Sequence, residues 1–367
     1  MLKTFKIGGV HPPENKLSKE KKVEVLPLPK TVFIPTGQHI GAPSTPVVKR
    51  GDEVKVGQLI AQSSSFVSAN IYSSVSGKVK KIDFSADSSG YPKQGIFITV
   101  EGDEWLEDID RSEELATNIP DDSTEIVNKI QKAGIVGMGG ATFPTHVKLV
   151  PPKGMTAEVL LINGVECEPY LTADHRMMLE KPDEIMVGIQ LLMKALNVNK
   201  AVIGIENNKP DAISLLSEKC KTYKGISIQP LKVQYPQGGE KQLINAVTGK
   251  EVPSGALPIA VGAVVSNVGT AFAVYEAVQK NKPLFERVVT VTGKGLTNPS
   301  NFKVRIGTAT SELIEAAGGL PENTGKIISG GPMMGRAIAT MDVPVTKGTS
   351  GILLMQDKES KREEIQP

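Results

Sequence analysis

The sequence is poor in the residues on which several classes of protein depend. Only two cysteines, Cys167 and Cys220, occur among 367 residues. A secreted fold held by disulfides, an all-cysteine zinc site and an iron–sulfur cluster each need more thiols, so the count argues against all three. The four histidines form no H-x-x-H or H-E-x-x-H pattern, and no C-x-x-C pattern occurs. We therefore expect no metal site.

Long apolar runs and a dominant charge are also absent. No stretch approaches the roughly 20 apolar residues that span a bilayer, and the N-terminus has no apolar segment of signal-peptide length. Lys and Arg number 42 against 40 Asp and Glu, a net charge of +2. Such a balance gives no basic field for nucleic acid. No G-x-S-x-G motif or Ser/His/Asp set occurs, so hydrolase chemistry has no support. We expect a cytoplasmic or peripheral protein that does not bind nucleic acid.

The first 30 residues differ in composition from the rest. They carry seven lysines, three glutamates and four prolines, and we interpret residues 1–30 as an extended basic arm. A solvated tail and a docking segment both remain open.

Residues 31–115 are predicted to be an all-β domain. Short apolar runs such as TVFIP and GIFITV are separated by Gly, Ser and Pro. The stretch VVKRGDEVKVGQLI followed by SSVSGKVKKI resembles the barrel-sandwich of lipoyl and biotinyl carrier domains. Such carriers present a modifiable lysine at a hairpin tip. The corresponding residues 63–70 contain no lysine, which favours a structural barrel over a swinging carrier. The run 101–125, with eleven acidic residues against Arg111, marks a boundary.

Residues 120–285 alternate strand and helix patterns. The continuous apolar run 157–163 is typical of a buried parallel strand, and residues 183–196 place apolar side chains at helical spacing. Strands at 201–205 and near 226–233 and 259–267 alternate with further helices, which predicts an α/β domain with a mainly parallel sheet. Residues 286–345 predict a hairpin, a short helix and a third strand, typical of a small β-grasp-like module. Residues 346–367 become charged and are predicted to be a linker.

A glycine-rich loop is the first candidate for chemistry. Gly137, Gly139 and Gly140 allow close approach of the backbone to a ligand. Pro144 is expected to begin a helix whose N-terminus favours a phosphate, and Lys148 adds a positive charge. The usual dinucleotide-binding fingerprint does not fit here, because the spacing is G-x-G-G and the loop follows a predicted helix and not a strand. A ligand loop and a structural turn remain open.

Polar residues follow three predicted strands. Asn163, Glu166, Cys167 and Glu168 follow the first, the run 235–241 follows another, and the run 266–270 follows a third. Ligands of open parallel sheets bind at the carboxyl ends of strands, so these residues should meet at one edge. The set suits a flat polar ligand with a phosphate, such as FMN. Loops that only cap the next helices are the alternative. Cys167 lies between two glutamates, which disfavours a thiolate.

These motifs resemble a known family over essentially the whole chain. The segments GIVGMGGATFPTHVK, INGVECEPYLTADHRMM, GIENNKPDAI, YPQGGEKQLINAVTGKEVPSG, SNVGTAFAVYEAV and GGPMMG are similar to those of RnfC, the C subunits of the Rnf electron transport complex. The central domain is more distantly similar to the NADH-binding flavoprotein subunit of complex I. The last module then resembles an SLBB domain.

The resemblance implies a peripheral subunit on the cytoplasmic face of the inner membrane. It would exchange hydride between NAD(H) and FMN within an ion-translocating NAD:ferredoxin oxidoreductase, with the other Rnf subunits as partners and ferredoxin as an indirect one. The cofactors do the chemistry, so no side chain is named as catalytic.

The resemblance also assigns cofactor-binding residues. The glycine loop and Lys148 would hold the FMN phosphate and ribityl chain, and Phe143 would stack on nicotinamide or adenine. Glu168 and Glu240 would contact the dinucleotide; Lys241 follows Glu240, where the complex I flavoprotein has a second glutamate. The full set implied is Gly137, Gly139, Gly140, Phe143, Lys148, Asn163, Glu166, Cys167, Glu168, Tyr235, Glu240, Asn267 and Thr270.

One departure from the family and two rival functions remain. The family continues into two motifs for [4Fe-4S] clusters, and this chain reaches Pro367 without them. It is therefore expected to be part of a longer chain or a variant without clusters.

A cobalamin reductase of bacterial microcompartments shares these modules, but there we expect the flavoprotein domain before the barrel. A non-enzymatic docking module of the same membrane complex is the other rival.

Overall fold

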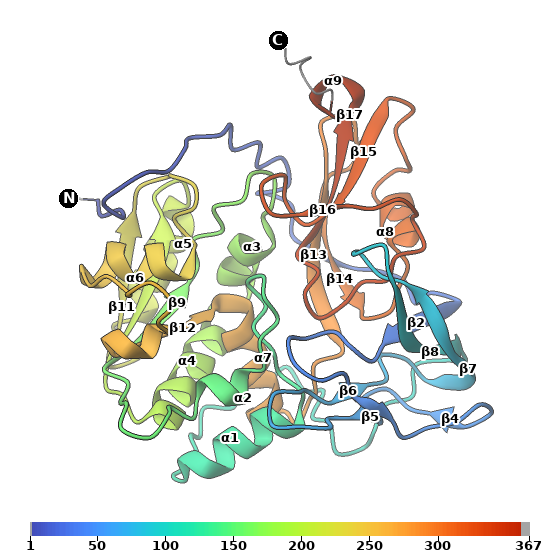
Figure 1. Cartoon of the computed structure of the whole chain (residues 1–367), viewed down its shortest axis with the longest axis horizontal. Coiled ribbons are helices and arrows are strands. Elements are labelled where there is room, and N and C mark those ends of the chain that lie inside the picture. Colours follow the sequence, from blue (N-terminus) through green and yellow to red (C-terminus); the bar gives the residue numbers. More distant parts are fainter. Residues whose placement is uncertain (1, 361–367) are drawn as a thin grey trace.

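The computed structural model describes residues 2–360, which fold into three modules and an N-terminal arm (Figure 1). The first module is the barrel-sandwich. One sheet has the order β2-β8-β7-β4 and the other β3-β5-β6. The bounds are β2 Thr31–Pro35, β3 Thr45–Pro46, β4 Glu53–Val54, β5 Leu59–Gln62, β6 Ile71–Tyr72, β7 Gly77–Ala86 and β8 Pro92–Val100. Isoleucines and valines from both sheets, among them Ile34, Ile60 and Ile98, are fully buried between them.

The second module is an α/β domain whose four strands are all parallel, in the order β11-β10-β9-β12. Leu160 and Ile162 of β9 pack in the large core with helices α4 and α7, whereas Leu161 packs with helix α6. Both faces are therefore covered, which explains the uninterrupted apolar run. The bounds are α1 Ser123–Lys132, α2 Thr145–Lys148, β9 Val159–Asn163, α3 Ala173–Glu180, α4 Pro182–Leu196, β10 Ala201–Glu206, α5 Pro210–Lys219, β11 Ile226–Leu231, α6 Glu240–Thr248, the 3₁₀ helix η1 Pro258–Val261, β12 Ala263–Asn267 and α7 Val268–Gln279.

The third module is a sheet of the order β1-β14-β13-β17-β15-β16, packed against helix α8. The predicted hairpin is antiparallel, as expected. The bounds are β1 Val23–Val25, β13 Glu286–Thr292, β14 Ser300–Arg305, α8 Thr310–Ala316, β15 Thr324–Ser329, β16 Arg336–Ala337, β17 Gly351–Gln356 and α9 Asp357–Ser360. The predicted fold class of the three modules is confirmed.

One boundary prediction was wrong. We predicted a linker over 346–367, but residues 351–356 form β17, which lies between β13 and β15. Ile352, Leu353 and Leu354 are buried there. The charged residues that suggested a linker begin only at Asp357. Residues 361–367 of the predicted linker lie outside the described part of the chain.

The N-terminal arm docks on its own chain. Lys3 forms a bridge with Leu231, and Val10 pairs with Tyr235. The arm then crosses to the third module, where β1 adds a parallel edge strand beside β14 (Figure 1). Of the two interpretations left open for residues 1–30, the described residues correspond to docking. Every helix within residues 2–360 is too short or too polar to cross a bilayer.

A buried lysine joins the three modules. The Lys347 Nζ donates to the carbonyl of Asn70 in the barrel at 2.6 Å and to that of Gly134 in the α/β domain at 2.7 Å. Its own carbonyl accepts from Arg287 Nη1 of β13 at 2.8 Å. Burial lowers the pKa of Lys347 to about 7. This residue therefore fixes the end of α1, from which the glycine loop departs.

Candidate functional site

The topology of the parallel sheet places a crevice between β9 and β12. The chain runs from β9 to β10 and β11 on one side and returns to β12 on the other. Such a reversal of strand order leaves an open crevice at the carboxyl ends, where ligands of α/β proteins bind. Asn163 ends β9, Asn267 ends β12, and the two are register partners. Two predicted site residues thus meet at the switch point.

Asn267 is held firmly at this edge. Its Oδ1 accepts from the Gly269 N–H at 2.8 Å and so caps α7, while its Nδ2 donates to Asp174 Oδ2 at 2.6 Å. The Asn163 Nδ2 donates to the Gly238 carbonyl at 2.9 Å, which ties β9 to the loop before α6. Both amides are therefore oriented by neighbours rather than free to rotate.

The glycine loop lies over the crevice. It leaves α1, as predicted, and is closed by a hydrogen bond from the Gly137 N–H to the Phe143 carbonyl at 2.8 Å. The Met138 N–H donates to Thr270 Oγ1 at 2.9 Å, which fixes the loop to the first turn of α7. A Cβ on Gly139 would lie 3.3 Å from Asn267 Cβ, so the loop backbone and the strand end are close.

The loop also leaves room for a ligand. Gly139 and Gly140 are exposed, and a Cβ on Gly140 would meet no atom within 4 Å. The helix expected after Pro144 is only the four residues of α2. The predicted helix is therefore present, with Pro144 at its N-terminus, but a single turn has a weak dipole. Phosphate binding at this N-terminus stays a prediction, and Lys148 adds a positive charge.

Lys148 reaches from α2 to the other side of the crevice. Its Nζ donates to Glu240 Oε1 at 2.8 Å and to the Val265 carbonyl at 3.2 Å. An ammonium group has three N–H donors, so one remains for a ligand. Glu240 is the first residue of α6, and the ion pair joins two of the predicted loops.

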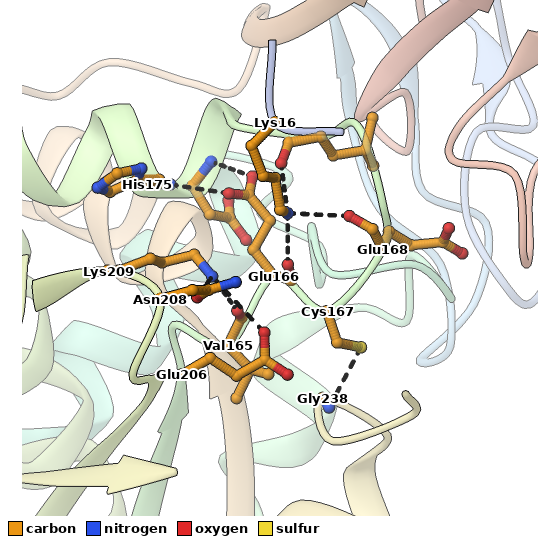
Figure 2. Close-up of polar contacts among 12 residues, drawn as sticks. Lys16, Val165, Glu166, Cys167, Glu168, His175, Glu206, Asn208, Lys209 and Gly238 are labelled. Atoms are coloured by element: carbon orange, nitrogen blue, oxygen red, sulfur yellow. Dashed lines mark hydrogen bonds and ion pairs between the residues drawn. The ribbon is translucent and has the colours of Figure 1, made fainter. Parts of the chain in front are cut away.

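The three polar residues of the loop after β9, Glu166, Cys167 and Glu168, each contact a different part of the chain. The Glu166 carboxylate accepts from the N–H groups of Asp174 at 2.7 Å and His175 at 3.2 Å, so it caps α3. The Cys167 Sγ accepts from the Gly238 N–H at 3.3 Å (Figure 2). Burial raises the pKa of Cys167 to about 11, which keeps the thiol protonated at neutral pH.

Glu168 faces the third module. Its two oxygens accept from the N–H groups of Met333 at 3.0 Å and Met334 at 2.7 Å. Burial raises the pKa of Glu168, although these two hydrogen bonds oppose the shift. In this arrangement Glu168 holds the GGPMMG loop of residues 330–335, and its contact with a dinucleotide stays a prediction.

A cavity of about 260 Å³ lies beside Cys167, on the β10 and β11 side of the sheet edge, and the N-terminal arm lines part of its wall. Tyr235 lines it, and burial raises the pKa of its hydroxyl. Glu14 and Lys16 of the arm and Glu206 of β10 also line it.

The barrel-sandwich contacts both the glycine loop and the helix α2 that follows it. The Phe66 carbonyl, in the tip segment 63–70, lies 3.0 Å from His146 Nε2 of α2, and the two rings meet edge to face at 5.7 Å. The Ile40 N–H donates to the Thr142 carbonyl at 3.3 Å. The position that carries a modified lysine in carrier domains is thus docked on the α/β domain.

Several residues at this edge were not singled out from the sequence. Lys209 is almost fully buried and its Nζ donates to the Val165 carbonyl at 2.7 Å. Burial raises the pKa of Asp174, the partner of Asn267, to about 7. Lys16 of the arm contacts the loop after β9. Asp174 and Lys209 lie in two of the segments that resemble the family, INGVECEPYLTADHRMM and GIENNKPDAI. Their spacing along the chain does not indicate which groups they pair with. Among residues 2–360, no three His, Cys, Asp or Glu side chains group as a metal site would require.

These features define an α/β protein with a candidate ligand site at the switch point of a parallel sheet. Three family models match the chain: the Nuo51 FMN-binding domain over residues 130–276, the RnfC barrel sandwich hybrid domain over residues 3–103 and the SLBB domain over residues 288–337.

Curated relatives match nearly the whole chain. The C subunits of three complexes serve as examples. That of the proton-translocating ferredoxin:NAD⁺ oxidoreductase complex of Clostridium ljungdahlii is 52% identical over 361 residues, covering 96% of this chain and 77% of that one. That of the Na⁺-translocating complex of Acetobacterium woodii is 44% identical, covering 98% and 80%. That of the ion-translocating oxidoreductase complex of Rhodobacter capsulatus is 42% identical, covering 100% and 71%. The chain therefore belongs to the family of C subunits of ion-translocating ferredoxin:NAD⁺ oxidoreductase complexes, and the resemblance noted from the sequence is confirmed.

A solved structure agrees on the fold alone. The NAD⁺-reducing [NiFe]-hydrogenase in its H2-reduced state matches with a TM-score of 0.53 and 22% identity, covering 65% of this chain and 47% of that chain.

Proposed function

We propose that this chain binds FMN at the β9–β12 crevice and exchanges hydride between FMN and NAD(H), as a peripheral subunit on the cytoplasmic face of its membrane complex. The other subunits of that complex are its partners, and ferredoxin is linked to it through them. The observation that carries the proposal is the convergence of exposed glycines, paired strand-end asparagines and one free Lys148 donor at a single switch point.

The residues at the crevice fit the chemistry of FMN. Lys148 offers an N–H to a phosphate, and the glycine backbone lets a ribityl chain approach closely. Asn163 and Asn267 carry amides that both donate and accept, which suits the polar edge of a flavin ring. A Cβ on Gly238 would lie 3.2 Å from Cys167 Sγ and 3.4 Å from Asn163 Nδ2, so a larger residue there would crowd the crevice.

FMN, when bound, supplies the hydride-accepting ring. The chain binds and orients the cofactor, while Glu240 sets the position of the Lys148 ammonium. Phe143 closes the glycine loop through its carbonyl, and its half-buried ring would stack on the dinucleotide. Carboxylates such as Glu240 repel a 2′-phosphate, which favours NADH over NADPH.

An anaerobic titration tests the proposal. The purified chain should quench FMN fluorescence saturably, and NADH should bleach the bound flavin. Lys148→Ala should weaken FMN binding by about 10- to 100-fold, the range for one lost hydrogen bond to a charged group. Lys153→Ala, an exposed lysine five residues on, is the matched control and should bind FMN normally. A folded wild-type chain that does not bind FMN would contradict the proposal.

A further inference from the structure

The N-terminal arm places one ammonium group inside the loop that follows β9. The Lys16 Nζ donates to the carbonyls of Glu166 at 2.8 Å, Glu168 at 2.9 Å and Leu171 at 2.6 Å (Figure 2). Three acceptors match the three N–H donors of a protonated lysine. The arm adds a second tie, because the Tyr170 N–H donates to the Glu14 carbonyl at 2.8 Å.

The loop has a conformation that it would not hold by itself. Glu166 has φ of +46° and Tyr170 has φ of +71°, a left-handed backbone that non-glycine residues avoid. Three carbonyl oxygens also point toward one place, and their partial negative charges repel one another unless a cation lies between them. Lys16 supplies that cation from a position 150 residues before Glu166 in the chain.

The charge environment of Lys16 is consistent with this task. Burial lowers the pKa of Lys16 to about 8, although Glu166 and Glu206 oppose the shift; Lys209 adds to it. The group therefore stays largely protonated at neutral pH. Its acceptors are backbone carbonyls of the loop that carries Glu166, Cys167 and Glu168, so it acts on the site through the backbone.

We infer that Lys16 is a positioning residue of the nucleotide site: it clamps the carbonyls of residues 166, 168 and 171 and thereby holds the loop that follows Asn163, at the edge of the crevice, in place for FMN. The inference rests on the proposed function. It makes the arm a part of the binding site, although the arm precedes the FMN-binding domain by a whole module.

The test compares FMN binding by full-length variants. Lys16→Ala should raise the FMN dissociation constant about tenfold, a coupling of ordinary size between a distant group and a site. Lys22→Ala, which removes an exposed lysine of the same arm, should leave it unchanged. Added n-propylammonium should restore tight binding to Lys16→Ala, because it replaces the lost cation and stem. Sodium chloride at the same ionic strength should not restore it.

The outcomes are separable. The positioning role is overturned if Lys16→Ala binds FMN like the wild type. It is also overturned if n-propylammonium does not restore the weakened binding. If Lys16→Ala is not recovered folded, Lys16→Met keeps the apolar stem without the charge; normal FMN binding by this variant overturns the inference and about tenfold weaker binding supports it. A wild-type chain that binds no FMN overturns both this inference and the proposed function.

Discussion

Replacing Lys347 by Met should change how stability depends on pH. The side chain is 1% exposed, and the two acceptors of its Nζ are the carbonyls of Asn70 and Gly134. A neutral amine has two N–H groups, so the neutral form satisfies this environment. Burial lowers the pKa of Lys347 from 10.5 to about 7. This shift corresponds to at most about 5 kcal/mol between the protonated and neutral forms.

The direction in which the free energy of unfolding changes with pH follows from the number of protons bound in the folded and unfolded states. Between pH 7 and 10.5 the unfolded chain keeps the proton on Lys347 and the folded chain loses it. Because the unfolded state then binds more protons, this group makes the free energy of unfolding rise with pH, by up to about 1.4 kcal/mol per pH unit. Below pH 7 both states are protonated and the contribution is constant.

Urea unfolding of wild type and Lys347→Met at several pH values measures this contribution. The difference in unfolding free energy should shift in favour of the wild type by about 1.2 kcal/mol between pH 7.5 and 8.5 and stay level below pH 6.5. The two carbonyls left unpaired in the variant add a penalty that does not depend on pH. Lys326→Met, on the exposed side of β15, should show no such trend. A difference that is the same at every pH refutes the argument.

Two further substitutions test contacts at other places. Gly188→Ala in α4 should destabilise the chain by about 3 kcal/mol in urea unfolding, because its Cβ would overlap the Ala271 carbonyl of α7; a loss below about 0.5 kcal/mol would contradict that close approach of the two helices. Glu168→Gln keeps only one oxygen acceptor for the N–H groups of Met333 and Met334. Hydrogen exchange at one of these amides should therefore accelerate about tenfold or more, because a charge-assisted hydrogen bond is lost. Unchanged exchange at both amides would show that the carboxylate does not hold this loop.

The sequence predicted the parts of the fold that local patterns determine. Alternating apolar runs and helical spacing identified the strands and helices of the α/β domain, because each element buries a face with its own period. The linker prediction failed at β17 since apolar residues 351–354 were outweighed by the charges that follow them. Local composition cannot show that a strand inserts between two others already assigned to a sheet.

The candidate site was predictable in part for the same reason. Residues after strands meet at one sheet edge, so Asn163 and Asn267 could be placed together from topology alone. Glu166 caps α3, the next helix along the chain, as in the alternative left open for this loop. Glu168 could not be given its partner, because the 330–335 loop comes near it only in three dimensions. The role of Lys16 could not be predicted from local patterns, because a lysine in a basic arm is normally solvated and its acceptors are backbone groups that no sequence pattern marks.

The long-range pairing of the arm has a consequence for biosynthesis. Val10 pairs with Tyr235 and Val23 with Asn301, so these contacts wait until more than 200 further residues have left the ribosome. The carbonyls that Lys16 contacts also follow it in the chain, by 150 to 155 residues. The arm is therefore synthesised first but gains its contacts late, because each of its partners belongs to a module that is made after the barrel-sandwich.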